Sequence, residues 1–208
     1  MPPAATVPAS VTAGNSPAFR YSFDDGDAAG WTGDPANWTV QPDETGDFFY
    51  EGAAAPGNDT ASELPNKATM STWRNYAVHF LMRAHQEGNN PDLPEFWLTT
   101  RAPLAEVAGC GFYNTYFDYR NQVITLAKGG DASCGYVPIE SNGYPQLAVG
   151  EWYDVVVAMQ ADRLQVTVDG ELLIDAEDSD VQQGYVYFNV GPGAIVQFDD
   201  VEVYKLDE

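Results

Sequence analysis

The sequence is poor in positive charge. It holds 9 Lys and Arg against 31 Asp and Glu, which gives a net charge of −22 at pH 7. Such a surface repels the phosphates of nucleic acids and of anionic lipids, so we expect no nucleic-acid partner. The excess carboxylates fit a solubilising surface, and they also fit a surface on which a few of them bind a hard cation such as Ca²⁺.

Long apolar runs are also missing. No stretch approaches the ~20 consecutive apolar residues that span a bilayer, so we expect no membrane insertion. No basic segment followed by an apolar one opens the chain, as a signal peptide would. Residues 1–17 are instead rich in Pro, Ala, Ser and Thr, a composition that buries too little apolar surface to fold. We interpret this segment as a flexible linker and expect a longer secreted parent chain with other domains.

Cysteine is scarce, with only Cys110 and Cys134 in the chain. They flank a predicted hairpin, and an extracellular location would allow a disulfide that stabilises the fold by roughly 3 kcal/mol. The alternative is two unpaired buried thiols. No C-x-x-C pair is present and histidine is rare, so we expect no zinc site.

Short apolar runs broken by Gly, Pro, Asn and Asp fill the rest of the chain, without helical periodicity. Residues 76–84 alternate in the manner of a central strand, and Asp169-Gly170 between two such runs is typical of a hairpin turn. Residues 53–66 and 129–149 look like loops. The pattern predicts an all-β protein, with residues 18–208 forming a single two-sheet antiparallel β-sandwich or jelly roll.

Several short motifs then occur in a characteristic order. They are Phe23-Asp24-Asp25-Gly26, Asn37-Trp38-Thr39-Val40, Gly150-Glu151-Trp152-Tyr153, Val166-Thr167-Val168-Asp169-Gly170, Gly184-Tyr185-Val186-Tyr187-Phe188 and Val196-Gln197-Phe198-Asp199-Asp200-Val201. This series resembles the concanavalin-A-like lectin and glucanase superfamily. It is similar to laminin-G-like and family-16-glycosidase-like domains, and to bacterial extracellular domains of the 3-keto-disaccharide hydrolase type. The resemblance implies a concanavalin-A-like sandwich at the cell surface or outside the cell, but a fold alone does not give a function.

The resemblance also implies a structural calcium. First and last strands are neighbours in such domains, so Asp24 and Asp25 would approach Asp199, which corresponds to a calcium-binding Asp of the last strand. The backbone carbonyl of Gly46 is a plausible further ligand. A calcium ion with 6–8 oxygen ligands would remove the repulsion between these carboxylates. The alternative is that the aspartates cap turns and face water.

A carbohydrate-binding face is the second candidate site. In residues 184–190, Tyr185, Tyr187 and Asn189 share one side of a strand, and aromatic rings with amides suit the apolar faces and hydroxyls of a sugar. Residues 112–119 carry aromatics on both sides, so their pattern leaves open which side faces outward. We expect the binding residues to be Trp97, Asn114, Tyr116, Asp118, Tyr185, Tyr187 and Asn189.

These observations favour a non-catalytic, lectin-like module that binds a poly- or oligosaccharide and is stabilised by calcium. One alternative is a glycoside hydrolase or polysaccharide lyase that uses a carboxylate pair such as Glu95 and Asp118, with His79 and Arg101 nearby in sequence. The E-x-D-x-x-E string of family-16 enzymes is absent, as are the G-x-S-x-G, H-E-x-x-H and P-loop motifs. A second alternative is a structural subunit of a surface layer or filament.

Overall fold

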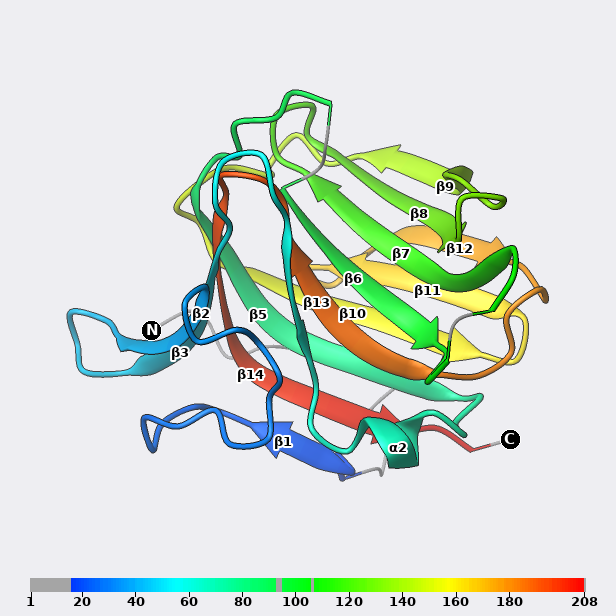
Figure 1. The fold of residues 1–208 in the computed structure, drawn as a ribbon, viewed down its shortest axis with the longest axis horizontal. Coiled ribbons are helices and arrows are strands. Elements are labelled where there is room, and N and C mark those ends of the chain that lie inside the picture. The colour runs from blue at the N-terminus through cyan, green and yellow to red at the C-terminus, as the bar shows by residue number, and fades with distance from the viewer. Residues whose placement is uncertain (1–15, 93–94, 106, 208) are drawn as a thin grey trace.

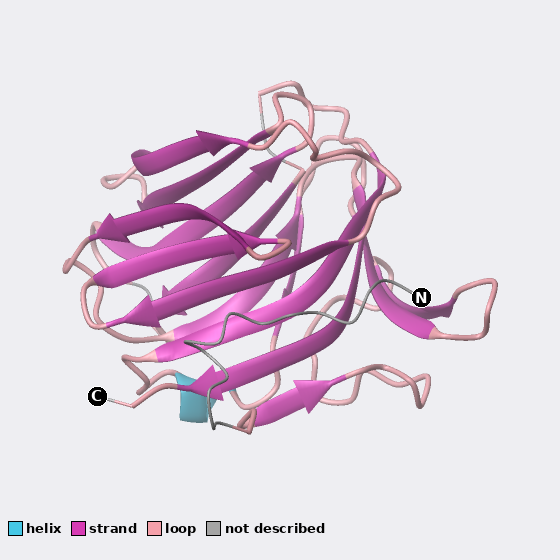
Figure 2. Ribbon diagram, turned by 180° about the vertical axis from the view of Figure 1, so that it is seen from behind, coloured by secondary structure: helices cyan, strands magenta, loops and turns pink. Residues whose placement is uncertain are grey.

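The computed structural model describes residues 16–92, 95–105 and 107–207. Two antiparallel sheets pack face to face in it, as Figures 1 and 2 show from opposite sides. This confirms the predicted all-β sandwich. The predicted linker of residues 1–17 lies outside the described residues, apart from its last two positions.

The larger sheet has the strand order β12-β11-β10-β5-β14-β3-β2, with β1 paired to β14. Its strands are β1 (Phe19–Tyr21), β2 (Trp38–Pro42), β3 (Phe48–Ala53), β5 (Tyr76–Gln86), β10 (Tyr153–Gln160), β11 (Arg163–Val168), β12 (Glu171–Glu177) and β14 (Ile195–Lys205). The two longest strands, β5 and β14, lie side by side at its centre.

The smaller sheet has the strand order β4-β13-β6-β7-β8-β9. Its strands are β4 (Thr60–Glu63), β6 (Phe96–Ala102), β7 (Cys110–Asp118), β8 (Val123–Gly130), β9 (Val137–Gly143) and β13 (Tyr185–Val190). Two of them, β4 and β9, lie in segments expected to be loops, because edge strands with mostly polar residues carry little apolar alternation. The short helix α2 (Lys67–Met70) follows β4.

Alternating side chains of both sheets fill the space between them. The rings of Phe80, Phe188 and Phe198 are fully buried there. Phe188 stacks on Phe198 with ring centroids 4.6 Å apart and meets Phe80 edge-on at 5.2 Å. Each such ring contributes roughly 1.5–3 kcal/mol by leaving water, so this core fixes which side of each strand faces inward.

The two ends of the domain meet in the larger sheet. Strand β1 pairs with β14 through Phe19 opposite Val203, which confirms the predicted neighbourhood of first and last strands. The register of β14 against β5 shifts between Asp199 and Glu202, and Asp200 has a φ of 46°. This irregularity is why the adjacent aspartates interrupt the alternation of the strand.

Cys110 at the start of β7 and Cys134 after β8 are joined by a disulfide. The bond links the two segments that leave the same end of this hairpin. Among the described residues, no helix is long and apolar enough to cross a membrane.

Candidate functional site

The outward face of the smaller sheet gathers the residues that were expected to bind a sugar. Trp97 on β6 pairs with Asn189 on β13 and with Tyr116 on β7, and directly paired residues project to the same side of a sheet. The side opposite Phe188 and the core therefore carries the whole predicted set. Its members are Trp97, Asn114, Tyr116, Asp118, Tyr185, Tyr187 and Asn189. That they bind a ligand remains a prediction.

The two amide side chains of this set are linked through a threonine in a chain of hydrogen bonds. Asn189 donates from Nδ2 to Thr99 Oγ1 at 3.0 Å, and Thr99 donates to Asn114 Oδ1 at 2.6 Å. Asn114 Nδ2 then donates to the Tyr116 hydroxyl at 2.8 Å. Asn114 and Asn189 are buried, so their role is to orient the Tyr116 phenol, whose own proton stays available to a ligand.

Aromatic rings form a continuous wall beside this network. Tyr116 lies between Trp97 and Tyr136, with ring centroids 5.8 Å and 5.4 Å away. Tyr136 is 57% exposed and belongs to the segment before β9. Tyr136 was not among the expected binding residues, because it lies in an irregular Gly-rich stretch and its aromatic ring was the one local feature that suggested binding. The wall therefore combines half-buried rings with one that is open to solvent.

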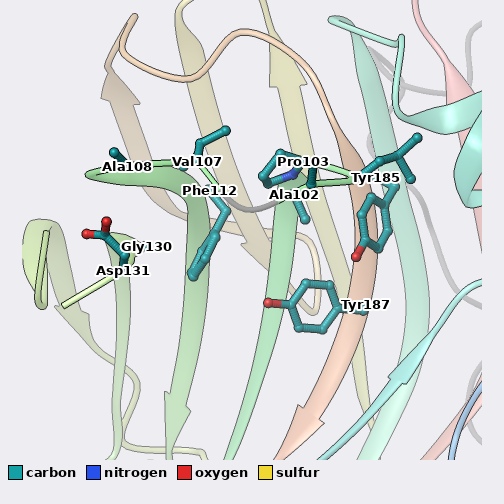
Figure 3. A pocket seen from close by; sticks show the side chains of 12 residues that line it. Ala102, Pro103, Val107, Ala108, Phe112, Gly130, Asp131, Tyr185 and Tyr187 are labelled. Atoms are coloured by element: carbon teal, nitrogen blue, oxygen red, sulfur yellow. The ribbon is translucent and has the colours of Figure 1, made fainter. Parts of the chain in front are cut away.

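A pocket of about 660 Å³ lies where this face meets the loop between β6 and β7. Figure 3 shows Tyr185 and Tyr187 of β13 on one side and Val107, Ala108 and Phe112 on the other. Tyr185 donates from its hydroxyl to Glu63 Oε1 at 2.8 Å. No sequence pattern could locate this pocket, because its walls come from three separate parts of the chain.

Two carboxylates lie at the opposite end of the same face. Glu95 is 3% exposed, and neither of its carboxylate oxygens has a hydrogen-bond partner among the described residues. Burial, followed by the charges of Glu87 and Asp118, raises the pKa of Glu95 to about 8. Asp118 accepts hydrogen bonds from the backbone amide and Nδ2 of Asn121 at 2.9 and 2.7 Å. A protonated acid at neutral pH thus lies near a second carboxylate.

Arg101 and His79, which lie near this pair in the sequence, are placed elsewhere. The Arg101 guanidinium is buried and donates to the carbonyls of Val181 and Ala161 at 2.7 and 2.6 Å. His79 lies on β5 of the other sheet, between Asp154 at 3.0 Å and Glu202 at 3.3 Å. Neither can assist Glu95, and Arg101 acts as a support for the loops around it.

The acidic end of the domain brings together Asp24, Asp47 and Asp199. Burial, then the charges of Asp200, Asp47 and Asp24, raises the pKa of Asp199 to about 7. The side chain of Asp47 is exposed, yet partial desolvation and then Asp24 raise its pKa. None of these three carboxylates is in an ion pair with a described residue. These carboxylates repel one another and have no ion-pair partner among the described residues, so they form an acidic cluster at this end of the domain.

The other two expected ligands lie at the edge of this cluster. Asp25 is exposed, and its Oδ1 accepts a hydrogen bond from the Asp27 amide at 3.1 Å. Gly46 lies in the exposed turn that carries Asp47, with its amide donating to the Asp43 carbonyl. Among the described residues, no three His, Cys, Asp or Glu side chains already stand in a metal-binding arrangement. Asp47 was missed by sequence analysis because nothing local separates it from the other turn aspartates.

The sandwich matches a known protein family. A family model described as a 3-keto-alpha-glucoside-1,2-lyase-like domain matches residues 18–204. The chain belongs to this family. The resemblance found from short motifs, to concanavalin-A-like domains of the 3-keto-disaccharide hydrolase type, is thereby confirmed. No curated protein matches this lyase-like domain in sequence.

Solved structures share the fold at low sequence identity. The carbohydrate-binding module CBM66 from Bacillus subtilis aligns with a TM-score of 0.62 and 19% identity, over 84% of this chain and 95% of that chain. The VIP36 exoplasmic domain in its Ca²⁺- and mannose-bound form gives 0.59 and 12%, over 86% and 84%. A carbohydrate esterase of Shiga toxin-encoding bacteriophage phi24B gives 0.59 and 10%, over 93% and 100%.

Proposed function

We propose that this lyase-like domain binds an oligo- or polysaccharide on the outward face of its smaller sheet. The observation that carries the proposal is the aromatic wall of Trp97, Tyr116 and Tyr136 beside a fixed hydrogen-bonding network. Aromatic faces cover the C–H surfaces of sugar rings, while the phenols and Asp118 meet hydroxyls. Exposed aromatic patches of this kind commonly mark binding sites in soluble proteins.

Two further observations support a role at the cell surface or outside the cell. The disulfide between Cys110 and Cys134 is of a kind that persists in oxidising compartments. Structures with the same fold include a carbohydrate-binding module and a lumenal domain bound to mannose. The acidic surface adds solubility and disfavours nucleic-acid partners.

We propose in addition that the acidic end binds a structural calcium ion. Asp24, Asp47 and Asp199 would supply carboxylate oxygens, and the Gly46 carbonyl, with Asp25 at the edge, would complete the donor set. Burial and then carboxylate repulsion raise the pKa of Asp199, and bound calcium would neutralise the repulsion. Such an ion would act on stability, because the cluster lies on the larger sheet and not on the sugar-binding face.

The binding proposal is tested with Tyr136→Ala. The ring is 57% exposed, so its loss leaves the fold intact. We expect the affinity for glycans on an array, or in affinity gel electrophoresis, to fall about tenfold, as for an aromatic hot spot. Leu172→Ala is the matched control, because Leu172 is 50% exposed on β12 of the other sheet. Equal binding by both variants and the wild type would contradict the proposal.

A second candidate function rests on Glu95. A carboxyl group that keeps its proton at neutral pH has the pKa of a general acid. The Glu95 oxygens are buried, so this role requires that they become accessible to a substrate on the adjoining face. Glycoside hydrolases need such a proton donor for the leaving-group oxygen. We expect Glu95→Gln to abolish turnover of a glycoside that the wild type cleaves; if neither protein cleaves any of a broad glycoside panel, this second function is excluded.

A further inference from the structure

The pocket at the β6–β7 end differs from the rest of the proposed sugar face in its chemistry. Seven of its twelve lining residues have hydrocarbon side chains, and they are Ala102, Pro103, Leu104, Ala105, Val107, Ala108 and Phe112. The polar side chains are Tyr185, Tyr187 and Asp131. The hydrocarbon side chains offer no hydrogen bonds, so sugar hydroxyls that face them would lack a partner, which costs affinity.

The apolar wall is built by close backbone approach. A Cβ on Gly111 would collide with the Val107 side chain, and a Cβ on Gly129 would collide with the Phe112 ring. The Asp131 amide donates to the Gly109 carbonyl, and the disulfide of Cys110 lies beside this contact. Glycines and the covalent bond therefore hold the loop against the sheet, so the pocket exists before a ligand arrives.

The charges around the pocket are negative. Asp131 lines it, and the hydroxyl and amide of Ser133 hold the pKa of Asp131 below its usual range. Glu63 lies behind Tyr185, where Lys67 forms an ion pair with it at 2.5 Å. Among the described lining residues Asp131 is the one charged side chain. Lys67 lies over the Tyr185 ring at 5.8 Å but is already paired with Glu63, so a carboxylate or sulfate on a ligand would meet Asp131 without a free cation among the lining residues.

Two of the apolar side chains that line the pocket are also exposed to solvent. Leu104 and Val107 are 57% and 44% exposed. An apolar surface that is held open beside a polar, aromatic face recognises a ligand that is itself part apolar and part polar. Tyr187 joins the two regions, because its half-buried phenol projects into the pocket from the strand that also carries Asn189.

We propose that this pocket binds the apolar substituent, an acetyl or methyl group, of an uncharged sugar unit whose ring lies on the adjoining aromatic face. The inference rests on the proposed carbohydrate binding and names the class of sugar. A plain hexose would leave the hydrocarbon wall uncovered, while a uronate would be repelled by Asp131. The hydroxyl of Tyr187 would meet the carbonyl oxygen of an acetyl group.

The test uses matched sugars on an array, in three sets built on glucose, galactose and mannose. Each set holds the plain sugar, its N-acetylamino form and its uronate. In at least one set we expect the N-acetyl form to bind about tenfold or more tightly than the plain sugar, since an apolar pocket gains this much from one such group. The uronate should bind most weakly.

Two variants assign the preference to the pocket. Val107→Asp should remove the preference for the N-acetyl form, and Val107→Thr, which keeps the side-chain shape, should reduce it. Val149→Asp and Val149→Thr are the controls, because Val149 is 42% exposed and lies outside the pocket. Both controls should keep the wild-type preference.

The outcomes separate this inference from the proposed function. Equal binding of plain and N-acetyl forms in every set, or a preference unaffected by either Val107 variant, overturns the pocket assignment. If binding in that case is still lost in Tyr136→Ala, carbohydrate binding on the aromatic face stands. Absence of binding to all nine sugars by the wild type overturns the pocket assignment, and absence of binding to every oligosaccharide on the array as well overturns both.

Discussion

Single residues on the outward face of the smaller sheet have distinct physical tasks. Asn114 and Asn189 use their side-chain amides in hydrogen bonds to Thr99 and Tyr116, while the ring of Tyr136 is exposed to solvent. Glu95 is the exception, because it is buried without a partner among the described residues. A group of this kind lowers the stability of the fold whenever it is ionised, and such groups are retained where function needs them.

This cost predicts the behaviour of Glu95→Gln. The folded-state pKa of about 8 lies above the unfolded value, so the folded form holds a proton that the unfolded form has already released. Stability due to Glu95 is therefore greatest at low pH and falls as the pH rises from about 4.5 to 8. We expect Glu95→Gln to be more stable than the wild type at pH 9, by on the order of 5 kcal/mol, and about equal at pH 4.

Urea unfolding at pH 4, 7 and 9 measures this difference. Glu140→Gln is the control, since Glu140 lies on the edge strand β9 and keeps partial exposure. Parallel pH curves for the wild type and Glu95→Gln would show that Glu95 ionises normally.

At the scale of elements, segments that are far apart in the chain meet at two places. The acidic cluster joins the segment after β1, the turn between β2 and β3, and β14. The disulfide joins β7 to the turn after β8. The disulfide lies at the end of a hairpin, where the sheet ladder leaves the backbone least restrained, and Asp199 lies within β14 next to its register shift against β5. We therefore expect changes at either place to alter the unfolding free energy of the domain and to leave the packing of its core unchanged.

Calcium is expected to raise the melting temperature of the wild-type protein. A ligand that binds only the folded state stabilises it by about 2.7 kcal/mol at a concentration 100-fold above its Kd, and for a domain of this size that corresponds to roughly 5–10 °C. Asp199→Asn should lose this response, while Asp92→Asn, an exposed loop variant outside the cluster, should keep it. Melting curves in CaCl₂ and in EDTA that coincide would refute a calcium site.

Removal of the disulfide is expected to loosen the pocket wall. The double variant Cys110→Ser, Cys134→Ser should lose about 2–4 kcal/mol of unfolding free energy, because its unfolded chain is less restricted. Hydrogen exchange should accelerate first in residues 107–112 and 129–135, which the bond holds together. Uniform acceleration over the whole domain would instead mean that the bond stabilises the fold globally.

At the scale of the whole molecule, charge is the dominant feature. A net charge of −22 means that like charges repel one another across the domain, which favours expansion. His79 reduces this repulsion locally. Its burial lowers its pKa, but Asp154 and Glu202 outweigh the burial, so the pKa of His79 is raised. The stabilisation by His79 is complete below its unfolded pKa and is lost as the pH rises through the raised value.

Salt is therefore expected to stabilise the domain at pH 8. Raising NaCl from 0.01 to 0.5 M shortens the screening length from about 30 Å to a few Å, which weakens the repulsion among surface carboxylates. The midpoint of thermal unfolding should rise by several degrees, and the gain should shrink at pH 5. A fall in the midpoint with salt at pH 8 would mean that ion pairs such as Arg163 with Asp175 outweigh the repulsion.

Local patterns in the sequence determined the fold class, the turn at Asp169-Gly170 and the acidic surface, while the pairing of the chain's two ends was implied by the resemblance to concanavalin-A-like domains. Local patterns also determined which residues share one side of a strand, as with Tyr185, Tyr187 and Asn189, because alternation along a strand is a local property. Aromatic side chains on both sides of β7 left the outward side undecided until the second sheet covered one of them.

Only the tertiary structure decided the rest. Tyr136 joined the aromatic wall, Asp47 joined the acidic cluster, and His79 and Arg101 were separated from Glu95. The pocket walls come from the β6–β7 loop, the Asp131 turn and β13, which are far apart in the chain. Contacts of this kind depend on how sheets stack and how loops fold back, and no short stretch of sequence contains that information.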